Sequence, residues 1–209
     1  MKKISILIAL VSVLLGCATP NIEKDYSLEK NPSMGVVVGS ITYQGPYSAY
    51  IVGYRQLPDG EAGQFQTGQS QMLIPYFPKK DFSEDDAEGD LFVAALPAGK
   101  YEIYWWRFNG GAAHISSEEP FKIEFTVVPG KFVYVGNFQF AISRKIGLVA
   151  GATVTYKDMS ERDLPKFKQK YPKFAGAPIS AAVEKGANFP NLGGESTANY
   201  TIPLIIPVQ

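Results

Sequence analysis

The sequence has one cysteine and one histidine, Cys17 and His114, among 209 residues. A chain with a single thiol cannot form an internal disulfide, so packing must stabilise its fold. The histidine lies in a loop close to Ser116 and Ser117, too near in sequence for an ordinary nucleophile–base pair, and the chain has no Gly-x-Ser-x-Gly elbow. A zinc site would have to rest on carboxylates, which is unusual. We therefore predict that the protein is not an enzyme and carries no metal or cofactor.

The chain also lacks a surplus of either charge. Its formal net charge is zero, and removal of residues 1–16 would take away two lysines and no acids, leaving −2. A near-neutral chain has no electrostatic footprint for nucleic acid, so no such partner is expected. The acidic stretch that starts at Asp81 does not match a calcium loop, because Asp86 stands at position six and Phe92 at position twelve. We interpret it as a solvated loop, with a calcium site of another type as the alternative.

Long apolar runs are scarce, and the clearest one stands at the N-terminus. A basic pair is followed by an apolar run over 4–15 and then by Leu-Leu-Gly before Cys17. The run is too short to span a membrane and is typical of a secretory signal peptide, residues 1–16. Its end resembles the lipobox of bacterial lipoproteins, in which the cysteine is acylated and becomes the new N-terminus.

This resemblance implies that lipidated Cys17 anchors the chain to a membrane of the bacterial cell envelope. Ala18 follows the cysteine where a sorting aspartate would otherwise stand, which implies the outer membrane. The alternative is a soluble secreted protein with a buried free cysteine.

Turn signals and alternating apolar residues predict a β-rich fold. Pro-Ala-Gly at 97–99 and Pro-Gly at 129–130 each precede a strand rich in aromatic and β-branched residues, over 100–108 and 131–142. Residues 119–128 alternate, and a tight hairpin is predicted between this strand and the next. Its core-facing side chains are predicted to be Phe121, Ile123, Phe125 and Val127. Further strands are predicted over 34–42, 47–57, 65–74, 91–96 and 149–157. This pattern indicates a mainly β fold, an antiparallel β-sandwich of about seven or eight strands.

One short amphipathic helix is predicted at about residues 160–171, where Ser160 begins a capping-box-like sequence. Leu164, Phe167 and Tyr171 share one face of this helix, and lysines surround that face. We interpret the apolar face as a docking surface for the sheet. Binding of the lysines to a membrane surface is the alternative.

The sandwich domain is accordingly predicted to span 33–173. A tether at 17–32 would precede it, and the alternative for this segment is an ordered edge pinned by Tyr26 and Leu28. An irregular extension rich in Gly, Ala and Pro, at 174–209, would follow it. The apolar stretch over 202–208 is expected to pack on the domain or on a partner.

Two turn-and-strand units carry a further resemblance. The sequence Leu-Pro-Ala-Gly-Lys-Tyr-Glu-Ile at 96–103 is similar to a strand of carboxypeptidase-regulatory-like, transthyretin-like sandwich domains. Residues 129–136 and 154–172 are similar to stretches of uncharacterised bacterial outer-membrane lipoproteins that contain such domains. The resemblance covers roughly 34–173 and implies an extracytoplasmic sandwich, with no catalytic residues to carry over.

The strand over 100–108 supplies the candidate ligand-binding residues, which are Tyr104, Trp105 and Trp106. Strict alternation would place Tyr101, Ile103 and Trp105 on one face and Tyr104, Trp106 and Phe108 on the other. Because a strand cannot put both faces into one core, one row must be covered by the helix and the end of the chain, or exposed to a ligand. Two functions are compatible with this pattern. One is a non-enzymatic, membrane-anchored module that binds or scaffolds an envelope protein, and the other is a carbohydrate- or peptidoglycan-binding module.

Overall fold

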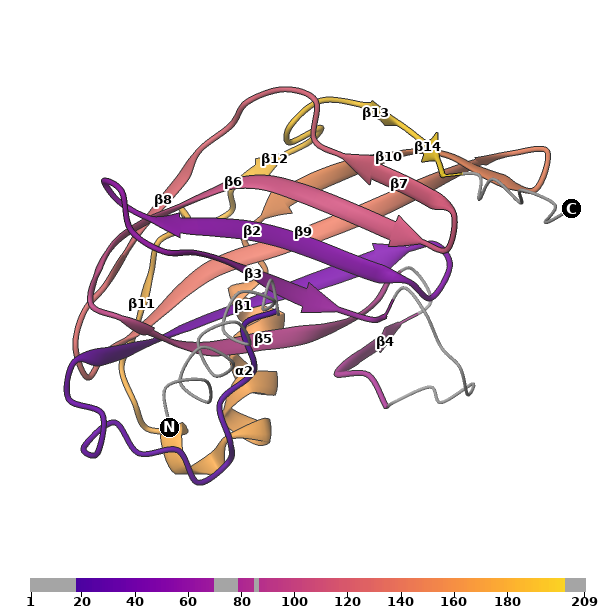
Figure 1. Cartoon of the computed structure of the whole chain (residues 1–209). Coiled ribbons are helices and arrows are strands. Elements are labelled where there is room, and N and C mark those ends of the chain that lie inside the picture. The colour runs from indigo at the N-terminus through magenta and orange to yellow at the C-terminus, as the bar shows by residue number, and fades with distance from the viewer. Residues whose placement is uncertain (1–17, 70–78, 85–86, 202–209) are drawn as a thin grey trace, which may run out of the picture.

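The computed structural model describes residues 18–69, 79–84 and 87–201, and Figure 1 shows its ribbon. Two β-sheets pack face to face. The strands of the first are β1 (Met34–Gln44), β4 (Phe82–Glu84), β5 (Ala87–Pro97), β9 (Phe132–Lys145), β10 (Leu148–Lys157), β11 (Ile179–Ala181), β12 (Asn188–Phe189) and β13 (Ser196–Thr197). Those of the second are β2 (Ala49–Gln56), β3 (Ala62–Thr67), β6 (Gly99–Gly110), β7 (Ala113–Ser116), β8 (Ile123–Val127) and β14 (Asn199–Tyr200).

Among the described residues the first sheet is eight-stranded and follows the order β12-β10-β9-β1-β5-β4, with β11 beside β9 and β13 beside β10. The second is six-stranded and follows the order β14-β7-β6-β2-β3, with β8 beside β6. Most neighbours are antiparallel, but β9 runs parallel to both β1 and β11. The predicted mainly β fold with one helix and an irregular C-terminal part is confirmed.

Aromatic rings from the two sheets meet in the core. Trp106 on β6 and Tyr50 on β2 each meet Phe140 on β9 in a T-shaped contact, with ring centroids 5.7 and 5.3 Å apart. Phe65 on β3 stacks on Phe92 on β5 at 4.2 Å. Because these aromatic side chains bury large apolar areas, they supply much of the free energy that holds the two sheets together.

The turn at Pro129-Gly130 connects β8 to β9, and the predicted hairpin at this position is wrong. The first of these strands pairs with β6, whereas the second pairs with β1 and β10 in the other sheet. The turn therefore passes between the sheets, and Gly130 accepts a left-handed φ of 69° there. The alternation along β8 is confirmed, since Phe125 and Val127 are buried while Glu124 is exposed.

Residues 18–32 pack against the sandwich, which differs from the predicted tether. The Thr19 amide donates a hydrogen bond to the Gln64 carbonyl on β3, at 2.8 Å. Ile22 is buried, and its amide donates to the Val93 carbonyl on β5, also at 2.8 Å. These two strands belong to different sheets, so the segment joins the sheets and covers backbone groups that an open edge would expose.

The C-terminal extension joins the sheets on the opposite side. Ser196 of β13 pairs with Ala152 of β10 in the eight-stranded sheet, and Tyr200 of β14 pairs with Ala113 of β7 in the six-stranded sheet. The remaining residues of the predicted extension, 202–209, lie outside the described residues, as do the predicted signal peptide and Cys17.

The helix α2 (Ser160–Lys170) and the short 3₁₀ turn η2 (Pro172–Phe174) cover the eight-stranded sheet. Phe167 and Phe174 both contact the ring of Phe132 on β9, at 5.8 and 5.1 Å between centroids. The predicted apolar docking face is therefore present. Its predicted place over the strand at 100–108 is wrong, because that strand is β6 of the other sheet. No helix within the described ranges is long and apolar enough to cross a membrane.

Candidate interaction surface on the six-stranded sheet

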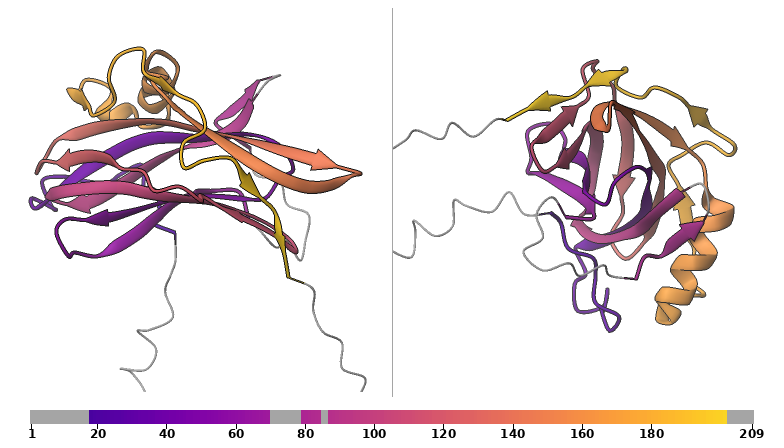
Figure 2. Two further views of the ribbon diagram at one scale, coloured as in Figure 1. Left: turned by 90° about the horizontal axis from the view of Figure 1, so that it is seen from above. Right: turned by 90° about the vertical axis from the view of Figure 1, so that its right-hand side faces the viewer.

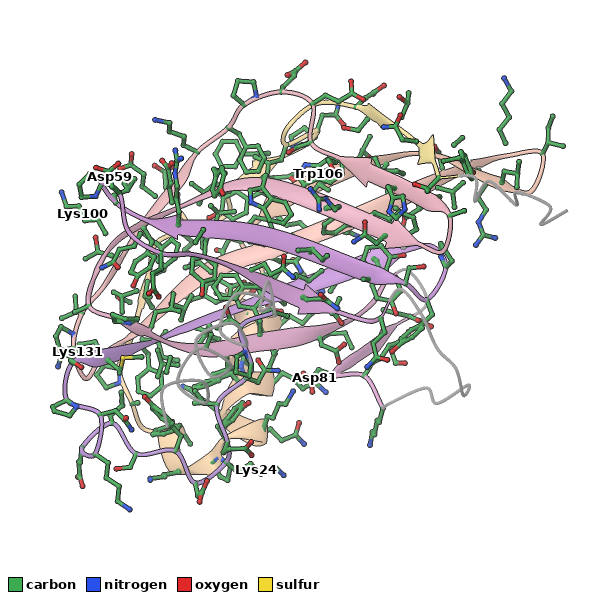
Figure 3. The ribbon with its side chains drawn as sticks, viewed as in Figure 1. Lys24, Asp59, Asp81, Lys100, Trp106 and Lys131 are labelled. Atoms are coloured by element: carbon green, nitrogen blue, oxygen red, sulfur yellow. The ribbon has the colours of Figure 1, made fainter. Side chains whose placement is uncertain are left out.

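Trp106, one of the three predicted ligand-binding residues, is a core residue. Its side chain is 0% exposed, and its indole Nε1 donates a hydrogen bond of 2.6 Å to the Leu192 carbonyl. Figure 3 labels it on β6. Because the ring is buried and its Nε1 is hydrogen-bonded inside the protein, Trp106 is not available to a ligand.

A β-bulge explains why strict alternation misplaced the aromatic rows of β6. Gly53 of β2 lies opposite Trp105, and the next residue, Tyr54, lies opposite Ile103, so Tyr104 is an extra residue in β6. An extra residue reverses the phase of the side chains that follow it. Residues on both sides of the bulge therefore face the core, namely Tyr101, Ile103, Trp106 and Phe108. Tyr104 and Trp105 are the two aromatic residues left half-buried on the outer face.

Two arginines flank these aromatic rings. The guanidinium carbon of Arg55 lies 4.6 Å from the ring centroid of Tyr104, and that of Arg107 lies 5.1 Å from the ring of Trp105. The two rings meet edge to face at 6.4 Å. Such cation–π and aromatic contacts hold the four side chains against each other. We refer to Arg55, Tyr104, Trp105 and Arg107 as the outer aromatic patch.

The indole ring of Trp105 packs directly on the backbone of Gly53. A Cβ atom at this position would lie 1.9 Å from Cε2 of the indole, so the ring rests directly on the glycine backbone. Any other residue at position 53 would displace the ring. One indole face is therefore packed on the protein, and the outer part of the ring remains accessible.

The outer aromatic patch carries positive charge that is partly balanced by the protein. Glu102 is 1% exposed and accepts a hydrogen bond of 2.6 Å from Nε of Arg55, with which it also forms an ion pair. Nε of Arg107 donates to Oγ of Ser116 at 3.2 Å, and the arginine itself is exposed. The negative charge of Glu102 is thus buried and paired with Arg55, while the positive charge of Arg107 remains exposed to a ligand.

The predicted lipidation site, Cys17, lies outside the described residues. Thr19, two positions later, is described and packs on the domain. Thr19 is bound to the edge of β3 through its amide, and its Oγ1 is hydrogen-bonded to the hydroxyl of Tyr54 at 2.7 Å. The folded domain therefore fixes the chain at Thr19, two positions after Cys17 in the sequence.

The other predicted polar features are bonded within the protein. Nδ1 of His114 lies 3.1 Å from Oδ1 of Asn109. Asp81 accepts hydrogen bonds from the Leu91 amide and from Nζ of Lys170, at 3.0 and 2.5 Å. No group of three or more potential metal-ligating side chains occurs within the ranges that the structure describes. Those parts of the acidic stretch that are described thus form structural contacts at the β4–β5 hairpin.

A buried polar network that sequence reasoning missed lies beneath α2. The carboxylate of Asp163 is fully buried and accepts hydrogen bonds from Ser40 Oγ, Tyr134 OH and Arg162 Nε, at 2.6, 2.8 and 2.9 Å. Asn137 in turn donates to Oγ of Ser40 at 2.7 Å. Burial raises the pKa of the Asp163 carboxyl, and the Arg162 charge and these hydrogen bonds oppose the rise. The sequence signal was present, since Ser40 and Asn137 are polar residues inside apolar strands.

The hydrogen bonds of this network connect α2 to the strands beneath it and stabilise its position. A surface cavity of about 500 Å³ lies beside it, between the start of the helix and Lys185-Gly186. Asp158, which lines the cavity, already accepts hydrogen bonds from the amides of Ser160 and Gly186. These polar groups are therefore already hydrogen-bonded within the protein. The outer aromatic patch remains the best candidate for binding a ligand or partner.

Comparison of the chain with protein-family models, with curated proteins and with solved structures finds no match. The candidate surface must therefore be interpreted from its own geometry.

Proposed function

We propose that this chain is a lipid-anchored lipoprotein of the bacterial outer membrane, whose β-sandwich is a non-enzymatic module that binds or scaffolds another envelope component. The signal peptide and lipobox-like end at Cys17 are the basis of this proposal. The observation that supports it is the attachment of Thr19 to β3, because the folded domain begins only two positions after Cys17 in the sequence. A domain that follows its anchor so directly works at the membrane surface.

The anchoring part of the proposal is tested by Cys17→Ser in the full chain. The parent should incorporate labelled palmitate, lose its signal peptide and float with membranes in a density gradient. The variant should incorporate no label and appear as uncleaved precursor or as soluble protein. A variant that is still processed and still floats with membranes would refute lipidation at Cys17.

A second candidate function is the binding of carbohydrate or peptidoglycan, and the half-buried rings of Tyr104 and Trp105 favour it, since aromatic rings on a sheet face can stack on sugars. Co-sedimentation of the protein with isolated peptidoglycan tests this function. Trp105→Ala should abolish sedimentation, whereas Phe189→Ala, which removes an exposed aromatic ring from the other sheet, should not. Equal sedimentation of both variants would exclude the outer aromatic patch as a glycan site.

A further inference from the structure

We propose that the outer face of the six-stranded sheet lies against the membrane and that Tyr104, Trp105 and Arg107 contact phospholipid headgroups. This inference rests on the proposed acylation of Cys17 and adds the orientation of the domain. It is derived from the positions of the two described chain ends, the chemistry of the face between them and the position of α2.

The described N-terminal end of the chain lies at one edge of this sheet. Thr19 is bound to Gln64 and Tyr54, and the first of these belongs to the edge strand β3. Acyl chains on Cys17, two positions before Thr19 in the sequence, would therefore favour a bilayer on the side of this edge.

The other described end lies at the opposite edge of the same sheet. The amide of Thr201 donates a hydrogen bond of 3.0 Å to the Ala112 carbonyl, next to the pairing of β14 with β7. The residues that follow, Ile-Pro-Leu-Ile-Ile-Pro-Val at 202–208, contain no charged side chain and five branched apolar residues. A proposed acylation site that precedes one edge in sequence and an uncharged apolar stretch that follows the other favour the same face toward the bilayer.

The side chains between these edges suit a phospholipid surface. Tyrosine and tryptophan are favoured where apolar and hydrated layers meet, because each has an apolar ring and a polar atom. The exposed guanidinium of Arg107 can bind a phosphate through two hydrogen bonds. Glu102 is buried and paired with Arg55, so it does not repel anionic headgroups.

The opposite face of the molecule is covered. Figure 2 shows α2 on the outside of the eight-stranded sheet, with the described ends of the chain on the side away from the helix. Two lysines near this helix already have acidic partners, since Lys170 pairs with Asp81 and Lys80 pairs with Glu88. The helix lies on the side away from both described chain ends, so it provides the control surface for the test.

The test uses the full acylated chain in vesicles of phosphatidylethanolamine and phosphatidylglycerol. Acylation consumes the Cys17 thiol, so a single introduced cysteine can be labelled with a nitroxide. Ala62→Cys places the label on the exposed outer face of β3, next to Arg55, and Lys168→Cys places it on the exposed face of α2. The label at 62 should be more accessible to oxygen than to a water-soluble nickel chelate, and the label at 168 should show the reverse.

The native tryptophans supply an independent measurement. Lipids brominated near the headgroup should quench part of the tryptophan fluorescence of the parent, because Trp105 faces outward and Trp106 is buried. Trp105→Phe should lose this quenching. Arg107→Glu should weaken it, whereas Lys168→Glu should leave it unchanged.

The outcomes separate this inference from the proposed function. If the protein floats with the vesicles while the labels at 62 and 168 are equally exposed to water, the orientation is wrong and the anchor stands. A label at 168 in lipid and a label at 62 in water would assign the membrane contact to α2 and also overturn the inference. Shielding of the label at 62 only when peptidoglycan fragments are added would show that the face binds glycan instead. A chain that does not float with the vesicles would refute the proposed function itself.

Discussion

Replacing Ile22 by alanine measures whether the N-terminal segment is part of the folded domain. The side chain is 8% exposed, its amide donates to Val93 on β5, and its carbonyl accepts a hydrogen bond of 3.2 Å from the hydroxyl of Tyr171. Truncating a buried isoleucine to alanine typically costs about 2–5 kcal/mol of unfolding free energy. Because Ile22 lies at the side of the sandwich, where neighbours can relax, we expect the lower part of that range, about 2–3 kcal/mol.

This loss is large against a domain stability of about 5–15 kcal/mol, and it should lower the melting temperature by about 4–12 °C for a domain of this size. Urea titration followed by the fluorescence of buried Trp106 measures the change in free energy. Lys24→Ala is the matched control, since Lys24 lies in the same segment, is exposed and should change stability by less than about 0.5 kcal/mol. Equal stability of the Ile22→Ala variant and the parent would refute the reasoning and restore the interpretation of 17–32 as a tether.

Three further predictions concern the core, the buried network and the tyrosines. Phe125→Ala should cost about 3–5 kcal/mol by denaturant titration, while exposed Glu124→Ala should cost almost nothing, and equal effects would contradict the phase of β8. Tyr134→Phe removes the hydrogen bond that Tyr134 donates to the buried Asp163 carboxylate and the one that it accepts from the Met159 amide, and it should cost about 1–3 kcal/mol, so an unchanged unfolding midpoint would show that the network does not stabilise α2. Burial raises the pKa of Tyr101 to about 12, which favours the folded state below pH 10 and removes that advantage as the pH rises from 10 through 12. Tyrosinate absorbance should therefore show a group that ionises together with unfolding, and complete titration of the folded protein at pH 10 would contradict the burial.

Local patterns in the sequence were sufficient to predict the buried faces of β8 and α2. Alternation along β8 predicted its buried face, because burial of one face imposes a period of two on any strand. The spacing of Phe167 and Tyr171 predicted the docking face of α2 for the corresponding reason, a period near 3.6. The signal peptide and its cysteine also depend on a short contiguous pattern, so they are predicted without knowledge of the fold and stay a prediction here.

The pairing of strands was not predictable in this way. Whether Pro129-Gly130 closes a hairpin or passes between sheets depends on which partners β8 and β9 find elsewhere in the chain. The contacts of Ile22 and of β13 and β14 likewise require the edges of both sheets to be in place. Such contacts join residues far apart in sequence, and periodicity carries no information about them.

The candidate surface depends on the tertiary structure most of all. The sequence by itself determined that β6 is strongly aromatic, and it placed Tyr104, Trp105 and Trp106 on one strand. Only the register with β2 decided that the extra residue falls at Tyr104, which turns Trp106 into the core and leaves Tyr104 and Trp105 outside. The physical reason is that a bulge shifts the phase of every later side chain in its strand, and its position is set by the packing of the neighbouring strand.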